Sequence, residues 1–218
     1  MRDLLPPTVA VAIAGPDDWT GELLPAELAC LNERAAQTRR RDFTAGRMCA
    51  RRALRDLGLA MTAVPASADR APVWPAGVVG SITHTAGYCA AAAAHSTDVR
   101  SVGMDAEQHH EINPGVRRLV LLPEEETACA RLPGGTCWPV VLFSAKETVY
   151  KVWYPIVRDW LGFHDARVEL DPDAGTFTAR IAPTRVDAAE VDDAPASITG
   201  RFVIADGLVR TAAVLGRG

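Results

Sequence analysis

Apolar runs and their spacing divide the first half of the chain into predicted strands. Residues Val9–Ala14 form a short apolar run that predicts one strand. The segments Val78–His84 and Tyr88–Ala94 flank the turn residues Thr85–Gly87, which predicts an antiparallel pair. The run Ser101–Ala106 predicts a further strand.

Two segments have helical spacing instead. Residues 28–58 predict one or two helices, with Gly58 as the stop signal. The apolar side chains that share one face of this segment are Phe43, Ala50, Leu54 and Leu57. A second helix is predicted from Pro139 to Tyr154, and Pro155 is expected to end it because proline has no amide hydrogen.

The C-terminal part of the chain predicts two hairpins. Ala166–Leu170 would pair with Thr176–Ile181, and Arg201–Ala205 would pair with Leu208–Leu215. The acidic, alanine-rich stretch Asp187–Ala196 between them predicts a surface loop. Strands and long helices of this kind predict an α+β fold.

Composition narrows the class of protein. The 218 residues are 48% hydrophobic and 23% charged, which is typical of a soluble globular protein. A net charge of −4 argues against nucleic acid as the main partner. The five cysteines are an odd number without a Cys-x-x-Cys pair, so we expect reduced thiols. The N-terminal residues lack the apolar core of a signal peptide, and the longest apolar run, Cys89–Ala94, is too short to span a bilayer. We therefore expect a cytoplasmic protein without a membrane segment.

Three carboxylates and a lysine are candidates for a catalytic centre. Asp105 and Glu107 are two residues apart on a predicted strand, so their side chains point to one face. Glu147 and Lys151 are four apart on a predicted helix and also share a face. Because carboxylates repel one another, such a group favours a hard cation, and oxygen ligands suit Mg²⁺ with bound phosphates. This pattern predicts magnesium-dependent phosphoryl-type transfer.

An excess of arginine marks the first long helix. Between residues 34 and 55 there are eight arginines and one acid, Asp42. Arg40, Arg47 and Arg51 form a stripe beside the apolar face. A solvated helix face would account for part of this pattern, but such a face usually mixes both signs, so the asymmetry favours an anion site.

The two chemical segments together resemble a known family. Gly103-Met104-Asp105-Ala106-Glu107, followed about forty residues later by Phe143-Ser144-Ala145-Lys146-Glu147 and Lys151, is similar to the paired signature of 4′-phosphopantetheinyl transferases of the surfactin-synthetase and enterobactin type, especially actinobacterial members. Arg39–Arg51 and Gly80–His84 resemble further motifs of that family, so the likeness covers about residues 37 to 163.

The resemblance implies transfer of 4′-phosphopantetheine from coenzyme A to a serine of an apo acyl or peptidyl carrier protein, which releases adenosine 3′,5′-bisphosphate. It implies Mg²⁺, with Mn²⁺ as an alternative, on Asp105, Glu107 and Glu147. The catalytic residues it implies are Asp105, Glu147, Lys151 and His84, with Glu147 as the base, directly or through a water. The residues it implies for coenzyme A are Arg39, Arg40, Arg47, Arg70, Ser81, Thr83, His84, Lys146 and Lys151.

The resemblance also implies an architecture. Members are monomers built as a pseudo-twofold pair of similar subdomains with the active site between them, here residues 1–100 and 101–218. The carrier and the pathway stay open, among fatty acid, polyketide, nonribosomal peptide and siderophore synthesis.

Two other functions and two side-chain roles are also open. A magnesium-dependent hydrolase of coenzyme A or nucleotides would need no carrier protein, and a coenzyme A or nucleotide sensor would need no metal. Trp74 could stack on an adenine or pack in the core. Residues Trp160–Phe163 could line a channel for pantetheine or belong to the core.

Overall fold

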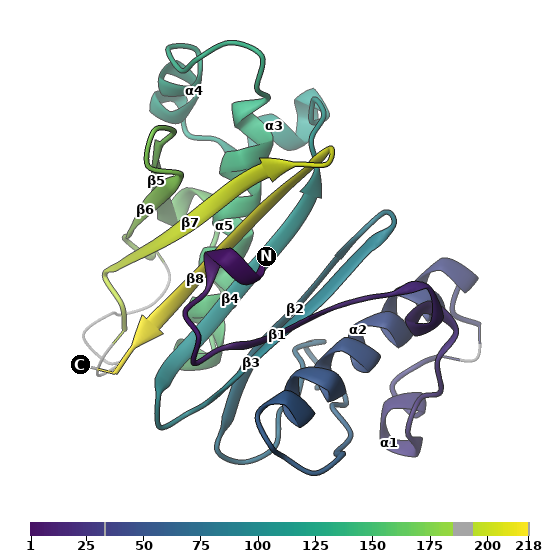
Figure 1. The fold of residues 1–218 in the computed structure, drawn as a ribbon. Coiled ribbons are helices and arrows are strands. Elements are labelled where there is room, and N and C mark those ends of the chain that lie inside the picture. The colour runs from purple at the N-terminus through teal and green to yellow at the C-terminus, as the bar shows by residue number, and fades with distance from the viewer. Residues whose placement is uncertain (33, 185–193, 218) are drawn as a thin grey trace. The chain divides into compact units, whose positions relative to one another are not determined.

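The computed structural model describes residues 1–32, 34–184 and 194–217 and divides into two compact units. The first unit consists mainly of residues 6–102 and the second mainly of residues 103–215 (Figure 1). Helices and antiparallel sheets occur together in the chain, which confirms the predicted α+β class. The pseudo-twofold relation and the assignment of functions to residues 1–100 and 101–218 stay predictions.

The first unit has a three-stranded antiparallel sheet and one long helix. Its sheet has the order β1-β3-β2. Before the sheet's hairpin the chain forms two short helical turns and then the long helix α2. The elements are β1 (Ala10–Ile13), η2 (Pro16–Thr20), α1 (Pro25–Leu28), α2 (Gln37–Asp56), β2 (Val78–Thr85) and β3 (Tyr88–His95).

Small side chains let α2 lie close to this sheet. Cys49, Ala50, Ala53 and Leu54 of α2 are fully buried, and they pack with alanines of β3. The β2–β3 turn has Gly87 at φ +73°, a conformation that favours glycine, so the predicted hairpin is confirmed.

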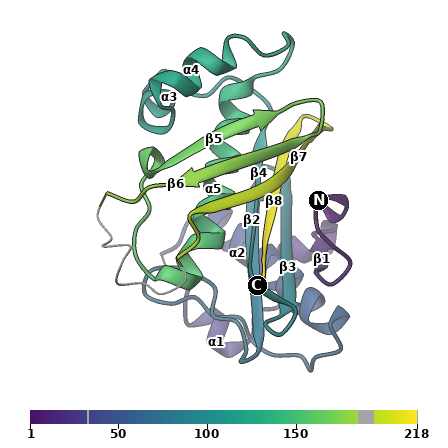
Figure 2. The same cartoon turned by 90° about the vertical axis from the view of Figure 1, so that its left-hand side faces the viewer.

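The second unit has a five-stranded sheet with the order β4-β8-β7-β6-β5. Figures 1 and 2 show the helix α5 lying against this sheet, and their contact forms the core of the unit. The elements are β4 (Val99–Gln108), α3 (Pro114–Val120), α4 (Pro123–Cys129), α5 (Trp138–Val157), η3 (Phe163–Asp165), β5 (Ala166–Asp171), β6 (Thr176–Ile181), β7 (Ser197–Ala205) and β8 (Leu208–Gly216), while the short η1 spans Arg2–Leu4.

The hairpins and the order of elements agree with the prediction, but two helix boundaries do not. The pairs β5–β6 and β7–β8 are both antiparallel, as predicted. Pro155 does not end α5; it lies inside the last turn, where its missing amide removes one hydrogen bond only, and Arg158 ends the helix with φ +59°. The predicted helix 28–58 begins as α2 only at Gln37, after the separate short helix α1.

The loop predicted at 187–196 lies largely outside the described residues. None of the helices in the described ranges combines the length and the apolar composition that a membrane span requires.

Candidate active site

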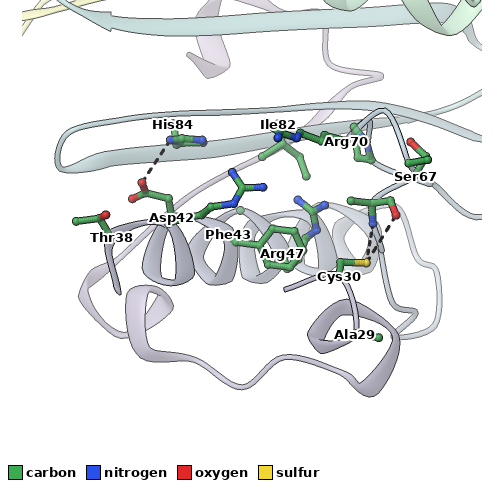
Figure 3. A pocket seen from close by; sticks show the side chains of 15 residues that line it. Ala29, Cys30, Thr38, Asp42, Phe43, Arg47, Ser67, Arg70, Ile82 and His84 are labelled. Carbon is green, nitrogen blue, oxygen red and sulfur yellow. Dashed lines mark hydrogen bonds and ion pairs between the residues drawn. The ribbon is translucent and has the colours of Figure 1, made fainter. Parts of the chain in front are cut away.

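A cavity of about 680 Å³ lies in the first unit between α2, the β2 strand and the loop that precedes it (Figure 3). Arg39, Phe43 and Arg47 line it because they follow one another at helical spacing on α2. A Cβ atom on Gly46 would come within 3.0 Å of the Ile82 side chain, so glycine permits the close approach of helix and strand.

Arg47 is the buried one of the three arginines that line this cavity. Its side chain stacks on Phe43, with the guanidinium carbon 4.0 Å from the ring centroid, and the residue is only 6% exposed. Its Nε has no hydrogen-bond partner among the described residues. Burial lowers the pKa of Arg47, although the charge of Glu27 acts in the opposite direction. A buried cation without a bonded anion is a favourable place for a phosphate.

Three more predicted residues reach this cavity. Arg39 and Arg70 are exposed and line it, and Arg70 has φ +69°, which places a non-glycine residue in the left-handed region. His84 lies on the opposite wall, where its Nδ1 is 3.7 Å from a carboxylate oxygen of Asp42 (Figure 3). The cavity thus gathers several cationic groups on few elements.

Other predicted residues of the first unit are placed differently. Ser81 and Thr83 are buried, and strand alternation directs them to the face of β2 opposite His84, so they do not line the cavity. Arg40 also lies outside the cavity lining, and its Nη2 donates to the Asn32 carbonyl at 3.4 Å. Trp74 packs in the core against Gly80, where a Cβ atom would be 2.4 Å from its ring, which favours packing over adenine stacking.

The second group of predicted residues lies in the second unit, on β4 and α5. Lys151 Nζ donates to Asp105 Oδ1 at 2.7 Å, and Ser144 Oγ donates to Asp105 Oδ2 at 2.9 Å. Gly103 makes this approach possible, because a Cβ atom there would be 2.4 Å from the Thr148 carbonyl oxygen. Asp105 is 4% exposed, so its carboxylate is largely shielded from water.

The charges of Asp105 and Lys151 also act on the other two predicted carboxylates, Glu107 and Glu147. Burial raises the pKa of Glu107 to about 7, the charges of Asp105 and Glu147 add to the rise, and Lys151 opposes it. Burial also raises the pKa of Glu147, with Lys151 opposing and Asp105 adding to the effect. A divalent cation would relieve this repulsion, and oxygen donors are the ligands that Mg²⁺ and Mn²⁺ prefer. Within the described residues, however, no three Asp, Glu, His or Cys side chains are arranged as a ready metal site.

The ammonium group of Lys146 is buried and makes three hydrogen bonds within the second unit. Its Nζ donates to Glu125 Oε2 at 2.7 Å, to the Val120 carbonyl at 2.8 Å and to the Phe163 carbonyl at 2.9 Å. These contacts use all three hydrogens of the ammonium group. They favour a structural role for Lys146 in place of the predicted contact with coenzyme A.

Glu125 is a buried structural residue that the sequence reasoning missed. It is 2% exposed, and it accepts hydrogen bonds from the amides of Leu122 and Val168 as well as from Lys146. Glu27 of the first unit accepts equivalent hydrogen bonds, from the amides of Leu24 and Val64 and from the guanidinium of Arg51. A repeated segment carries both acids, Leu-Leu-Pro-Ala-Glu at 23–27 and Leu-Leu-Pro-Glu-Glu at 121–125. That repeat was the signal available in the sequence.

A smaller, more apolar cavity of about 210 Å³ lies beside Glu147. Tyr150, Trp160 and Phe163 are among its lining residues, and Trp160 is 56% exposed. Leu161 also lines it but is 5% exposed and belongs to the core. The segment 160–163 therefore contributes to both a cavity wall and the core.

Comparisons with known proteins identify the family of the chain. Residues 25–94 match the model of the 4′-phosphopantetheinyl transferase N-terminal domain, and residues 101–204 match that of the 4′-phosphopantetheinyl transferase superfamily. The chain is 39% identical to 4′-phosphopantetheinyl transferase PptT of Mycobacterium tuberculosis, over 88% of this chain and 86% of that protein. It is 42% identical to 4′-phosphopantetheinyl transferase Svp of Streptomyces mobaraensis, over 90% and 80% respectively. Enterobactin synthase component D of Salmonella typhimurium is 33% identical, over 62% of this chain and 56% of that protein. The chain is therefore an enzyme that belongs to the 4′-phosphopantetheinyl transferase superfamily.

Proposed function

We propose that this enzyme transfers 4′-phosphopantetheine from coenzyme A to a serine hydroxyl of an apo acyl or peptidyl carrier protein and releases adenosine 3′,5′-bisphosphate. The observation that carries the proposal is Arg47, a buried cation without a hydrogen-bond partner at Nε among the described residues, in a cavity that also holds Arg39 and Arg70. The 3′-phosphate of the coenzyme would bind these arginines. Arg40, Ser81 and Thr83 lie outside the lining of this cavity, so the proposal assigns them no contact with the 3′-phosphate.

The chemistry is assigned to the group around Asp105. The serine oxygen attacks the β-phosphorus, the bond from that phosphorus to the bridging oxygen breaks, and the serine proton passes to Glu147, directly or through a water. Lys151 would hold the β-phosphate, and His84 would donate a hydrogen bond on the α-phosphate side. Mg²⁺ or Mn²⁺, held by Asp105, Glu107 and Glu147, would neutralise charge on the pyrophosphate.

The cavity beside Glu147 suits the uncharged pantetheine arm, because most of its lining residues are aromatic or aliphatic. We further propose a monomeric enzyme of the cytoplasm that acts on carrier proteins and needs neither nucleic acid nor a membrane. Its pathway could be fatty acid, polyketide, nonribosomal peptide or siderophore synthesis.

The test is the intact mass of an apo carrier protein after incubation with the enzyme, coenzyme A and Mg²⁺. We expect the mass to increase by one phosphopantetheine group, and we expect EDTA to prevent this. Consumption of coenzyme A without modification of the carrier would instead indicate a hydrolase. An unmodified carrier with coenzyme A intact, across several carriers, would favour a sensor.

The matched variant is Asp105→Ala. It removes one proposed metal ligand, and residue 105 does not line the cavity of the first unit. We expect it to lose transfer but to bind coenzyme A in EDTA. Normal transfer by this variant at saturating coenzyme A would refute the assignment of the metal strand.

A further inference from the structure

A chain of buried hydroxyl groups extends from Asp105 into the second unit. Ser144 and Thr148 lie one turn apart on α5, and Thr211 lies on β8. All three are fully buried. Ser144 Oγ is 2.9 Å from Asp105 Oδ2 and 2.9 Å from Thr211 Oγ1, and Thr211 Oγ1 is 2.7 Å from Thr148 Oγ1.

The direction of the hydrogen bonds follows from the carboxylate. An ionised carboxylate only accepts, so the hydroxyl hydrogen of Ser144 is directed to Asp105. The Thr211 hydroxyl hydrogen is then directed to Ser144, whose Oγ and carbonyl oxygen lie at 2.9 and 3.0 Å. Thr148 in turn donates to Thr211. The hydroxyl hydrogens thus lead from Thr148 to Thr211, from Thr211 to Ser144 and from Ser144 to Asp105.

The hydroxyl chain and Lys151 contact different oxygens of Asp105. Oδ2 is held by Ser144 inside the unit, while Oδ1 accepts from the half-buried Lys151. Resting on the proposed function, we infer that Ser144, Thr211 and Thr148 are positioning residues that hold Asp105 in the orientation in which Oδ1 can bind a divalent cation. Groups that orient a metal ligand in this way typically change metal affinity about 10- to 100-fold when they are removed.

A purely structural role for the hydroxyls predicts something different. They would then only join α5 to β8, and their loss would lower the stability without changing metal affinity in the folded protein. The readout must therefore be metal binding itself, measured on the full-length protein without coenzyme A. Mn²⁺ is a suitable probe, because free Mn²⁺ gives an electron paramagnetic resonance signal that decreases on binding.

We expect Ser144→Ala to weaken Mn²⁺ binding about 10- to 100-fold. Thr211→Val should weaken it less, and Thr148→Val least, because each is one hydrogen bond farther from Asp105. Thr211→Ser keeps the hydroxyl and should bind Mn²⁺ like the wild type. Thr178→Val is the matched control, since its hydroxyl lies on β6, 3.5 Å from that of Thr199 and outside this chain.

If folded Ser144→Ala binds Mn²⁺ like the wild type while Asp105→Asn loses binding, the inference is overturned and the proposed function stands. If Ser144→Ala does not fold, the pair Thr211→Val and Thr211→Ser decides, and equal binding by the two overturns the inference. Wild-type protein that binds no Mn²⁺ would refute the metal part of the proposed function and the inference together. Coenzyme A binding in EDTA should be unchanged in every folded variant.

Discussion

Arg47 and Arg51 lie one turn apart on α2, and their environments predict different effects of the same substitution. Both residues are buried, with 6% and 9% exposure. Arg51 is paired with the fully buried Glu27 and also donates to the Glu22 carbonyl at 2.6 Å. Arg47 has neither an ion pair nor a partner for Nε among the described residues. We therefore expect Arg47→Met to change the free energy of unfolding little or to raise it, and Arg51→Met to lower it clearly.

The magnitudes follow from these contacts. An unsatisfied buried donor costs about 1–3 kcal/mol, so its removal at position 47 is favourable by that amount. The lost cation–π contact with Phe43 offsets about 0.5–2 kcal/mol of this gain. Methionine keeps the unbranched stem, so the free energy of unfolding should change by between about −1 and +2.5 kcal/mol, which is centred on a small gain. Arg51→Met leaves Glu27 buried without its cation and should cost about 3–5 kcal/mol.

In contrast to the stability, the affinity of Arg47→Met for coenzyme A should decrease. If Arg47 donates to the 3′-phosphate, its loss removes a charge-assisted hydrogen bond of about 1.5–3 kcal/mol. That corresponds to an increase of about 10- to 150-fold in the Kd of coenzyme A. Dephospho-coenzyme A lacks the 3′-phosphate, so Arg47→Met should bind this analogue like the wild type.

Urea denaturation of both variants and calorimetric titration of the two ligands in EDTA test the reasoning. EDTA removes metal, so the titrations report the cavity of the first unit and not the metal centre. Two results would refute the reasoning: Arg47→Met destabilised as strongly as Arg51→Met, or wild-type affinity of Arg47→Met for coenzyme A. An equal loss for both ligands would place Arg47 at another part of the coenzyme.

Three further outcomes follow from single contacts. Glu125→Gln should lower the free energy of unfolding by about 3–5 kcal/mol, because Lys146 stays buried without its anion; urea denaturation measures this. Gly103→Ala should destabilise by about 1–3 kcal/mol through overpacking and also reduce Mn²⁺ binding, as β4 must move away from α5. Cys30 lines the cavity, so coenzyme A should slow its alkylation by iodoacetamide while leaving the half-buried Cys137 unaffected, as peptide mass spectrometry would show.

The elements that the sequence predicted well are those with local causes. The β5–β6 and β7–β8 hairpins are set by turn residues within a few positions, such as Asp206 at φ +56° and Gly207 at φ +72°. The boundaries of α5 were less accurate, because a proline in the last turn removes only one hydrogen bond. Periodicity thus predicts that an element exists more reliably than where it ends.

The site was predicted only in part, because its contacts join distant residues. The spacing of Asp105 and Glu107, and of Glu147 and Lys151, indicated which side chains share a face. It could not indicate that Ser144 bonds Asp105, 39 residues away. The role of Glu125 was missed for the same reason, since Val168, which donates its amide to it, is 43 residues away. Acids are common in the first turn of a helix because the macrodipole favours them, so the charge of Glu125 does not indicate a buried role.

Ion pairing decides which cations of the chain can bind a ligand. Lys146 and Lys151 belong to one sequence motif and share one helix, yet their side chains are 1% and 26% exposed. Lys146 is paired with Glu125, which also accepts hydrogen bonds from two backbone amides. Moving the ammonium away would leave a buried anion and two carbonyl oxygens without their donor. Lys151 is paired with Asp105, which is itself a proposed metal ligand. Under the proposed function, a divalent cation on Asp105 would replace the charge of Lys151. The ammonium group, which also donates to the Met104 carbonyl at 3.2 Å, would then bind a phosphate oxygen, and Lys151 would be the lysine of the motif that exchanges its partner during the reaction.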